Sequence, residues 1–385
     1  MKSDIVFCNR NRIKVLALIW DMGNGGAQQV VINNLRFFKN DADVDYKVIA
    51  FLPPNDSRND KVIESEHLNV EYLGYPKSKI RIPVIRYPFN KLVEYKAWKQ
   101  VIARENPDVV HVHISELLTT TLWAINRCNV SVKFDTLHSN PYRYKGYALW
   151  CIKKAFNRYG FMPLCLNELQ ASQAKDHYGI NRYEIVHNGI DIDSIRAKRT
   201  DKSEARKRLG IPADVFALAG VGRLDPIKNY DLMLEVFAEV VRNKDKARLY
   251  IAGGGNQDEL RVMAENLGIA EKVEFMGYVN NVSDIYCAVD RLLMTSHSEA
   301  SPLTLIEAQL CGTKCVVSSG VPVESVISDG VSQMKAESSA SDWAQEILNS
   351  EHVVKPKLTE KDYDLEASNE RIKELYLKYS ERVEK

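Results

Sequence analysis

The sequence predicts an α/β fold with two doubly wound, Rossmann-like domains. The chain has 385 residues, more than one hydrophobic core ordinarily serves, so two domains are expected. Short apolar runs rich in β-formers alternate with amphipathic stretches, which is the pattern of parallel sheets covered by helices. This alternation occurs separately in each half of the chain. Each half is therefore expected to form its own sheet and core.

The predicted strands follow one another along both halves. In the first half they are expected at residues 12–20, 46–51, 69–74, 108–113, 131–138, 162–167 and 183–189. In the second half they are expected at residues 215–224, 247–255, 272–278, 290–296 and 314–319. Helical patterns fall between them, as at 229–243, where apolar residues recur every three or four positions. Because such sheets bind ligands at the carboxyl ends of their strands, the two domains are expected to face a central cleft.

Changes in composition divide the chain into three parts. Residues 1–186 are expected to form an N-terminal domain and residues 187–360 a C-terminal domain. The junction is placed in the polar, charged stretch 187–207. The highly charged segment 361–385 is expected to form a helix that crosses back and packs on the N-terminal domain.

The two halves carry opposite net charge. The whole chain has a net charge of +1, but residues 1–186 carry 26 basic and 18 acidic side chains, a net +8. Residues 187–385 carry 26 basic and 33 acidic side chains, a net −7. The first half is therefore expected to meet an anionic surface or substrate. The seven cysteines form no CxxC pair, and no apolar run approaches the ~20 residues of a membrane span. These features predict a cytoplasmic location.

Two glutamates lie around a predicted helix start in the second half. Glu299 follows the strand at 290–296, and Glu307 lies within the helix. Ser301 is expected to be the N-cap and Pro302 the first helical residue, because the missing N–H of proline costs nothing there. The free N–H groups of this helix start favour an anion such as a phosphate.

The spacing of these groups suits a nucleotide sugar. The N–H groups of Leu303 and Thr304 would meet a phosphate, and Glu307, about one turn further on, can accept two hydrogen bonds from a vicinal diol such as a ribose. A nucleotide sugar supplies ribose, phosphates and sugar hydroxyls in one molecule. The sequence therefore predicts such a ligand at this helix.

A cationic turn and two glycine turns agree with this prediction. In "AGVGRLDPIKN" (219–229), Arg223 ends a strand and Lys228 precedes the next helix, where both can neutralise a diphosphate. Two further glycine turns, "IAGGGNQ" (251–257) and "FMGY" (275–278), lie at the ends of the predicted strands 247–255 and 272–278. All of these turns are expected at carboxyl ends of strands, hence at the same edge of the sheet.

These residues resemble the family 4 retaining glycosyltransferases of the GT-B fold. The resemblance extends from residue 23 to about residue 330. It is carried by "GGAQQVVINNL" (25–35), "DTLHSN" (135–140), "VHNGID" (186–191), "GRLDPIKN" (222–229), "IAGGG" (251–255), "FMGYVNNV" (275–282) and "EASPLTLIEAQLCGTKCVVSS" (299–319).

The resemblance implies roles for individual residues. The implied catalytic residues are His138, Arg223, Lys228 and Glu299. The implied donor-binding residues are Gly25, Gly26, Arg223, Lys228, Gly277, Tyr278, Glu299, Ser301, Leu303, Thr304 and Glu307. Arg223 and Lys228 would hold the departing diphosphate, Glu307 the ribose, and Glu299 and His138 the donor sugar. The first domain would then hold the acceptor and the second the nucleotide sugar.

The resemblance also implies the reaction. A sugar would pass from a nucleotide donor, UDP rather than GDP, to a hydroxyl of a glycan or lipid-linked glycan in bacterial cell-surface polysaccharide synthesis. Catalysis would be electrostatic, with no metal, no cofactor and no protein nucleophile. The "DID" at 191–193 resembles a metal motif of another transferase fold but lies in the domain junction, so no metal role is assigned to it.

The sequence departs from the family pattern in the sugar pocket. Ala300 and Ser301 stand after the first glutamate, where a glycine and a bulky residue are common. The first-half loop continues "AQQ" where an acid is frequent. The identities of the sugar and of the acceptor are therefore not inferred.

Two basic, aromatic stretches of the first half suit an anionic membrane surface. Residues 76–100 hold seven basic residues against Glu94 alone, and residues 142–161 hold five basic residues, seven aromatic residues and no acid. A groove for an anionic acceptor would use the same features. No nucleic-acid-binding motif is found, so nucleic acid is not expected as a partner.

Three other classes of function compete with a transferase. A nucleotide-sugar epimerase of the same architecture would turn over the donor without an acceptor. A dinucleotide-dependent dehydrogenase would need GxGxxG, but Gln28 stands where the last glycine belongs in "GNGGAQ" (23–28). A non-catalytic protein would bind the donor without turnover.

Overall fold

The chain folds into two compact α/β units. The structure, a computed structural model, describes residues 12–74, 83–279, 281–335, 337–349 and 362–381. Unit 1 comprises residues 1–187 together with 366–385, and unit 2 comprises residues 188–365. Within the described residues, no helix combines the length and the apolar character needed to cross a bilayer.

Unit 1 is built on a seven-stranded, all-parallel sheet in the order β3-β2-β1-β4-β5-β6-β7. Its strands are β1 (Ile13–Ile19), β2 (Val44–Ala50), β3 (Val70–Tyr72), β4 (Val109–His113), β5 (Val132–Thr136), β6 (Met162–Cys165) and β7 (Glu184–Ile185). Its helices are α1 (Gly26–Phe38), α2 (Arg58–Ser65), α3 (Pro83–Glu105), α4 (Leu118–Arg127), α5 (Gly146–Arg158), α6 (Glu168–Tyr178) and α14 (Leu365–Glu381), with 3-10 turns η1 (Ser115–Leu117) and η2 (Pro141–Arg143).

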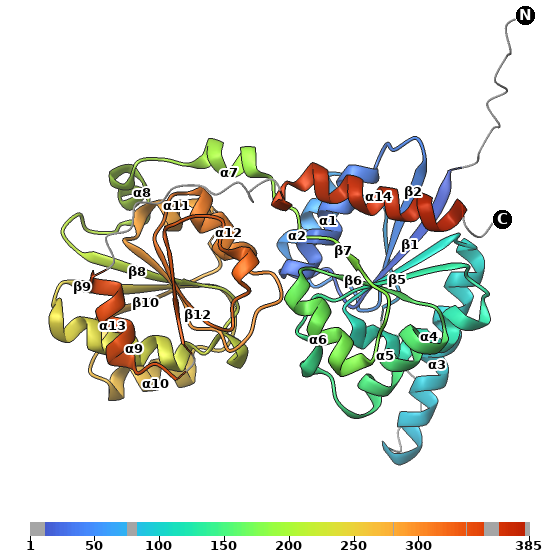
Figure 1. Cartoon of the computed structure of the whole chain (residues 1–385), viewed down its shortest axis with the longest axis horizontal. Helices are drawn as coiled ribbons and strands as arrows, with labels where there is room; N and C mark the ends of the chain where they lie inside the picture. The colour runs from blue at the N-terminus through green and yellow to red at the C-terminus, as the bar shows by residue number, and fades with distance from the viewer. Residues whose placement is uncertain (1–11, 75–82, 280, 336, 350–361, 382–385) are drawn as a thin grey trace, which may run out of the picture. The chain divides into compact units, whose positions relative to one another are not determined.

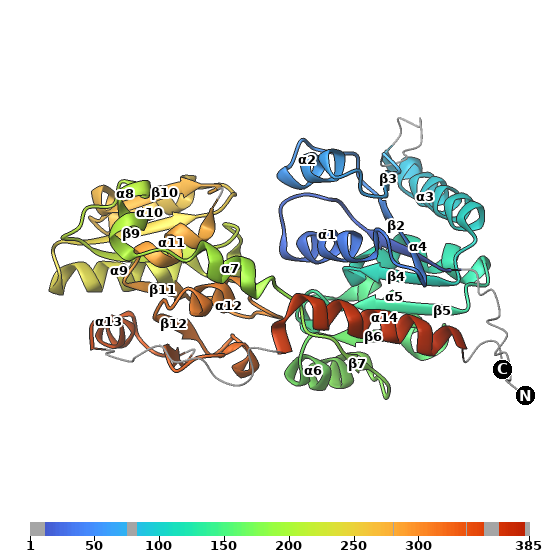
Figure 2. The ribbon, with the colours of Figure 1, turned by 90° about the horizontal axis from the view of Figure 1, so that it is seen from above.

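Both faces of this sheet are covered, as the nearly continuous apolar strands require. Side chains of α3, α4, α5 and α6 pack on one face around Trp98 and Ile152. Side chains of α1, α2 and α14 pack on the other face around Val31 and Tyr376 (Figures 1 and 2). The two cores hold all seven strands in one layer.

The last helix, α14, returns to unit 1, as the sequence predicts. Tyr376 is fully buried, and its hydroxyl lies 2.6 Å from His111 Nδ1 of β4. Lys373 pairs with Asp41 at 2.7 Å, and Glu184 of β7 accepts hydrogen bonds from several residues of the helix, Arg371, Lys378 and Tyr379. A chain segment far away in sequence therefore completes the N-terminal domain.

Unit 2 is built on a six-stranded parallel sheet in the order β10-β9-β8-β11-β12-β13. Its strands are β8 (Phe216–Val221), β9 (Ala247–Ala252), β10 (Val273–Gly277), β11 (Arg291–Met294), β12 (Cys315–Ser318) and β13 (Val331–Met334). Its helices are α7 (Ile192–Lys198), α8 (Lys202–Leu209), α9 (Tyr230–Asn243), α10 (Asp258–Asn266), α11 (Val282–Ala288), α12 (Leu303–Leu310) and α13 (Ala340–Asn349), with 3-10 turns η3 (Pro226–Lys228), η4 (Ala270–Lys272) and η5 (Val323–Ser325).

Helices also cover both faces of the second sheet. Side chains of α9, α10 and α13 pack on one face around Phe237 and Trp343. Side chains of α8, α11 and α12 pack on the other around Tyr286 and Leu305. The predicted fold class, two doubly wound domains with a C-terminal helix crossing back, is confirmed.

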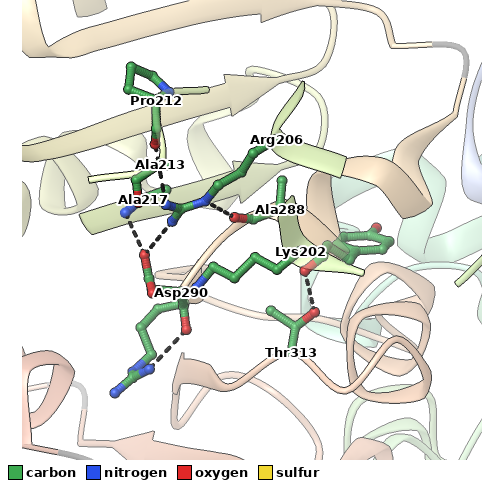
Figure 3. Close-up of polar contacts among 10 residues, drawn as sticks. Lys202, Arg206, Pro212, Ala213, Ala217, Ala288, Asp290 and Thr313 are labelled. Atoms are coloured by element: carbon green, nitrogen blue, oxygen red, sulfur yellow. Dashed lines mark hydrogen bonds and ion pairs between the residues drawn. The ribbon is translucent and has the colours of Figure 1, made fainter. Parts of the chain in front are cut away.

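A partly buried acid, Asp290, ties the amino edge of the unit 2 sheet together. Asp290 accepts hydrogen bonds from Arg206 of α8 at 2.9 Å and from the Ala217 backbone of β8 at 2.7 Å. Arg206 also donates to the carbonyls of Ala288 and Ala213 (Figure 3). This network lies at the end of β8 and β11 opposite to the predicted site, so it supports the fold rather than the chemistry.

Candidate active site

The predicted residues of unit 2 gather at the topological switch point of its sheet. From β8 the chain continues to β9 on one side, while β11 lies against β8 on the other. The connections after β8 and β11 therefore leave in opposite directions, which opens a crevice at their carboxyl ends. Arg223 and Lys228 follow β8, and Glu299 follows β11.

A tight turn after β8 positions Lys228. The Asp225 carboxylate accepts a hydrogen bond from the Ile227 N–H at 3.0 Å and so caps the 3-10 turn η3. Asn229 then adopts a left-handed conformation (φ 53°) before α9 begins. The Thr295 hydroxyl, beyond β11, donates to the carbonyls of Lys228 and Asn229. The loops of the two strands are thereby joined.

Lys228 and Glu299 are in direct contact. Lys228 Nζ lies 2.7 Å from Glu299 Oε1, and their side chains are 21% and 11% exposed. The same carboxylate oxygen accepts the Ser296 hydroxyl at 2.6 Å, and the Glu299 N–H donates to the Gly320 carbonyl at 2.9 Å. The lysine and the acid, predicted to bind different parts of a donor, thus form one ion pair.

The helix α12 begins one residue later than predicted. Pro302, rather than Ser301, is the N-cap, and no side chain caps the helix. The expectation of a Ser301 cap is wrong because the Pro302 backbone is not helical (ψ 88°). The Ser301 hydroxyl oxygen is instead buried without a hydrogen-bond partner among the described residues. Leu303 and Thr304 are the first two helical residues.

Glu307 lies one turn into α12 and is partly buried. Its carboxylate accepts the Tyr286 hydroxyl of α11 at 2.9 Å. Burial raises the pKa of Glu307 to about 7, although the Tyr286 hydrogen bond and Lys198 act in the opposite direction. The Thr313 hydroxyl donates to the Tyr286 carbonyl at 2.7 Å and holds the tyrosine in place. Within the described part of the chain, the Glu307 carboxylate bonds Tyr286 and forms no ion pair or hydrogen bond with Lys228 or Glu299.

Arg223 and the glycine turns lie on the other side of Lys228. Arg223 is 64% exposed, and its guanidinium is 3.9 Å from the Asp225 carboxylate. A Cβ at Gly253 would lie 1.8 Å from the Gly222 carbonyl oxygen, so only glycine permits this approach to the Arg223 loop. Tyr278 follows Gly277 (φ +64°), is 67% exposed, and places its ring against Gly254.

The unit 1 residues lie at the carboxyl edge of the first sheet. Gly25 is the N-cap of α1, and neither a side-chain cap nor an acid occupies the first turn of that helix. A Cβ at Gly25 would lie 2.3 Å from Gln28 Oε1, whereas the space at Gly26 is open. The preceding loop is fixed by Asp21, which accepts hydrogen bonds from the Gly23 N–H and from Gln28.

His138 lies two residues after β5 and contacts a second histidine. Its Nε2 is 3.0 Å from Nδ1 of His113, the last residue of β4. Burial lowers the pKa of His138 to about 4, so the ring is neutral at pH 7. His138 as a whole residue is only partly buried.

The sequence did not indicate two residues that hold the predicted ones: Ser296 binds Glu299, and Tyr286 binds Glu307. Tyr286 is distant from its partner along the chain, whereas Ser296 is close to it. The alternating histidines of "DVVHVH" (108–113) favour structural or supporting roles for His111 and His113. In the structure, His113 supports His138.

The basic, aromatic stretches of unit 1 are only partly exposed. Residues 76–82 lie outside the part that the structure describes. Helices α3, α4 and α5 carry exposed large apolar side chains: Phe89, Leu92, Trp123, Tyr147 and Trp150. Tyr142, also exposed, lies in η2. Trp150 stacks on Tyr147 and lies under Lys154 Nζ, 5.6 Å from the ring centroid. Glu94 is buried and pairs with Lys91.

The fold defines a class of α/β proteins with two domains, each built on a parallel sheet with helices on both faces. Residues 24–194 match the model of Glycosyltransferase Family 4, and residues 201–353 match that of the Glycosyl transferases group 1. The two matches together extend over most of the chain. The protein therefore belongs to glycosyltransferase family 4, as the sequence motifs indicate.

Curated relatives match part of the chain. The D-inositol 3-phosphate glycosyltransferase of Geodermatophilus obscurus is 32% identical over 182 residues, which is 44% of this chain and 40% of that protein. The enzyme of the same name from Mycobacterium ulcerans is 34% identical over 161 residues, or 39% and 33% of the two chains. These alignments span less than half of the relatives' length.

Solved structures share the whole fold. HepE from Anabaena, in complex with UDP and glucose, superposes with a TM-score of 0.78 over 94% of this chain and 99% of that chain, at 18% identity. WaaG, a glycosyltransferase involved in lipopolysaccharide biosynthesis, gives a TM-score of 0.70 over 92% and 94%, at 16% identity. At these identities the likeness concerns the fold.

Proposed function

We propose that the protein is a retaining glycosyltransferase that moves a sugar from a nucleotide diphosphate donor, preferably a UDP-sugar, to a hydroxyl of a glycan or lipid-linked glycan. The proposed setting is bacterial cell-surface polysaccharide synthesis, at the inner face of the membrane. The observation that carries the donor proposal is the meeting of Lys228, Glu299 and the start of α12 at the switch point of unit 2. HepE, with the same fold, was solved with UDP and glucose.

Binding of the proposed donor would separate the Lys228–Glu299 ion pair and give each side chain a new partner. A diphosphate near the uncapped start of α12 attracts the Lys228 ammonium away from Glu299. Glu299 keeps its hydrogen bond from Ser296 and becomes free to accept one from a sugar hydroxyl. Arg223, exposed and held only loosely by Asp225, would close on the other phosphate oxygens.

The remaining groups fit the rest of a nucleotide sugar. Glu307 would accept the ribose hydroxyls, and Gly277 and Tyr278 would border the base. Gly25 and Gly26 would approach the diphosphate from the first domain, and Ser301, Leu303 and Thr304 would orient the donor. The Ser301 hydroxyl, which is buried and has no hydrogen-bond partner in the described part of the chain, supports this assignment.

Catalysis would then be electrostatic. The sugar–phosphate bond breaks as negative charge grows on the diphosphate, which Arg223, Lys228 and the α12 N–H groups stabilise. The acceptor hydroxyl attacks the anomeric carbon from the face that the diphosphate leaves, and its proton passes to the departing phosphate oxygen. His138 would donate a hydrogen bond to the sugar. We expect no metal and no resident cofactor, since the nucleotide sugar is itself a substrate.

The partner of the exposed aromatic layer is proposed to be an anionic membrane. Trp123 and Trp150, with Lys154 and Arg158 beside them, suit the headgroup region, where aromatic rings and cations both bind. Sedimentation with phosphatidylglycerol vesicles, but not with phosphatidylcholine vesicles, is the expected result. Loss of sedimentation in a Trp123→Ser, Trp150→Ser variant would assign it to this layer, and equal binding to both vesicles would contradict the proposal.

The test of the transferase proposal starts with binding. A thermal-shift panel of nucleoside diphosphates and nucleotide sugars identifies the donor, and mass spectrometry then follows products on glycan, lipid-linked and inositol phosphate acceptors. Lys228→Gln is expected to lower turnover about 10²-fold. The matched control is Lys272→Gln, because Lys272 also pairs with an acid in unit 2 but lies beyond the amino end of β10.

Each alternative gives a distinct outcome. Conversion of the donor to an isomer without any acceptor would favour an epimerase. Binding of a UDP-sugar with no turnover on any acceptor would favour a non-catalytic binding protein. Stabilisation by NAD alone would favour a dehydrogenase, and each of these results would overturn the transferase proposal.

A further inference from the structure

A pair of histidines at the carboxyl edge of the unit 1 sheet has a defined direction of hydrogen bonding. His113 ends β4, and in the parallel register it pairs with Thr136, so that His138 follows directly beside it. The two rings lie nearly parallel, 21° apart, with His113 Nδ1 3.0 Å from His138 Nε2. Because an N–H must lie between them, one ring donates and the other accepts.

Both rings are neutral. His113 is fully buried, and burial together with the neighbouring histidines His111 and His138 lowers its pKa well below the usual value. Burial likewise lowers the pKa of His138 to about 4. At pH 7 each imidazole therefore carries a single proton, and its two nitrogens have opposite roles.

The second nitrogen of His113 decides which ring donates. His113 Nε2 is buried and has no hydrogen-bond partner among the described residues. The adjacent His111 ring, 4.1 Å away, is occupied by the Tyr376 and Thr136 hydroxyls. If His138 Nε2–H donated to His113 Nδ1, the single proton of His113 would be on Nε2. That N–H would be buried without a partner among the described residues. Buried N–H groups without a partner are rarer than buried acceptors without one. The favoured arrangement therefore has His113 Nδ1–H donating to His138 Nε2.

The tautomer of His138 follows from this direction. With Nε2 accepting, the single proton of a neutral His138 must be on Nδ1. The ring then presents an N–H, which can donate to an oxygen but cannot take up a proton there. His113 itself is too deeply buried to reach a ligand.

The backbone at this point is strained. Ile114, directly after His113, has φ +70° and ψ +96°, a conformation that a β-branched residue rarely adopts. Such a strained backbone persists only where the surrounding structure enforces it, often at functional sites. Here the strained residue directly follows His113, the last residue of β4.

We propose that His113 is a positioning residue that holds His138 as its Nδ1–H tautomer, so that His138 donates a hydrogen bond to a hydroxyl oxygen of the donor sugar. This inference rests on the proposed transferase function for the identity of the ligand. The tautomer itself is a property of the protein alone.

The first experiment measures the tautomer without any substrate. In protein labelled with 15N at its eight histidines, two-bond 1H–15N correlation spectra distinguish Nδ1–H from Nε2–H rings, and His138→Gln identifies the relevant signals. We expect Nδ1–H at His138 in the wild type and in His113→Asn, whose amide can donate from the position of Nδ1. We expect a loss of this preference in His113→Leu. An Nε2–H ring in the wild type overturns the proposal.

The second experiment tests the consequence for turnover. His113→Leu is expected to lower kcat about 10- to 100-fold with little change in the donor KM, and His113→Asn to restore most of it. Thermal unfolding shows whether each variant is folded. Unchanged kcat in a folded His113→Leu would overturn the positioning role while leaving the transferase proposal intact. A wild type without any transfer activity would instead reject the transferase function, and with it the sugar as ligand, whatever tautomer is found.

Discussion

Lys228 and Glu299 are the residues on which the account of unit 2 depends most. Their side chains neutralise each other at the carboxyl edge of the sheet, 2.7 Å apart and mostly buried. A diphosphate and a sugar hydroxyl offer each of them a new partner. Glu299 is predicted to bind the sugar and Lys228 the phosphates, yet the two side chains contact each other. Separation of this ion pair upon donor binding would reconcile the two observations.

Glu299→Gln tests this exchange of partners. The amide cannot compete with phosphate for Lys228, so we expect UDP to bind about 2- to 10-fold more tightly, as for a partly buried ion pair. Sugar transfer is expected to fall at least about 10²-fold because the amide is a weaker acceptor for the sugar hydroxyl. Calorimetry with UDP and a product assay measure the two effects. Weaker binding of UDP would mean that Glu299 positions Lys228 instead of competing for it.

Glu307→Gln tests the environment of Glu307, the residue that is predicted to bind the ribose. The pKa of Glu307 is raised from 4.5 to about 7, so the folded protein binds more protons than the unfolded chain between these values. This carboxyl group therefore lowers stability as the pH rises from about 4.5 to 7. Relative to the wild type, Glu307→Gln should gain about 1–3 kcal/mol between pH 5 and pH 8 and should bind UDP more weakly. Urea unfolding at the two pH values measures the gain, and a constant difference would be inconsistent with the raised pKa.

At the scale of elements, α14 is the segment whose attachment is most specific. Its buried face carries the Tyr376 hydroxyl into contact with His111, in the middle of the unit 1 sheet. His111 in turn contacts the Thr136 hydroxyl through Nε2 at 2.7 Å. The helix therefore supports the strands that carry His113 and His138.

Tyr376→Phe should loosen this helix. It keeps the ring but removes the hydroxyl from a buried network, which is expected to cost about 1–3 kcal/mol. Hydrogen exchange of residues 366–381 and the unfolding free energy are the measurements. Tyr379→Phe is the matched control, because its hydroxyl bonds Glu184 at a partly exposed position and should matter less. Equal effects of the two changes would argue against a special role for the buried hydroxyl.

The elements with strong apolar patterns could be predicted from the sequence, and the weaker ones could not. All twelve predicted strands are present in the structure. For most strand ends, the predicted and observed positions differ by no more than three residues. These strands could be predicted because buried parallel strands are continuous apolar runs. The edge strand β13 was missed because its sequence, "VSQM", is short and half polar. The start of α12 was misplaced because the residue types at 301 and 302 do not reveal that the Pro302 backbone is non-helical.

The sequence predicts a set of site residues but not the contacts among them. Residue types at strand ends indicated Arg223, Lys228, Glu299 and Glu307. The Lys228–Glu299 pair joins positions 71 residues apart, and the His113–His138 pair joins positions 25 apart. Such contacts depend on the order of strands in the sheet, which local patterns do not reveal.

At the scale of the whole molecule, the two units should respond to acid differently. Burial lowers the pKa of His111 to about 3 and of His138 to about 4, and it lowers that of His113 as well. The unfolded chain therefore binds more protons at these sites below pH 6.5, so unit 1 loses stability as the pH falls from about 6.5 towards 4. Asp135, whose pKa burial raises, offsets part of this loss. Glu307 has the opposite effect in unit 2.

Denaturant unfolding at pH 7 and pH 5 checks this difference. Four of the five tryptophans, at 20, 98, 123 and 150, belong to unit 1, so fluorescence reports mainly on that unit. The midpoint of the fluorescence transition is expected to be lower at pH 5. A midpoint that rises or stays constant would show that the three histidines are not buried in their neutral form.

A crystal structure of the protein with a UDP-sugar would show whether the nucleotide binds at the switch point of unit 2. We expect the diphosphate at the carboxyl ends of β8 and β11, with Lys228 withdrawn from Glu299 to a phosphate oxygen and Glu307 bonded to the ribose. A nucleotide bound elsewhere, with the Lys228–Glu299 pair unbroken and Glu307 still bonded only to Tyr286, would contradict this expectation.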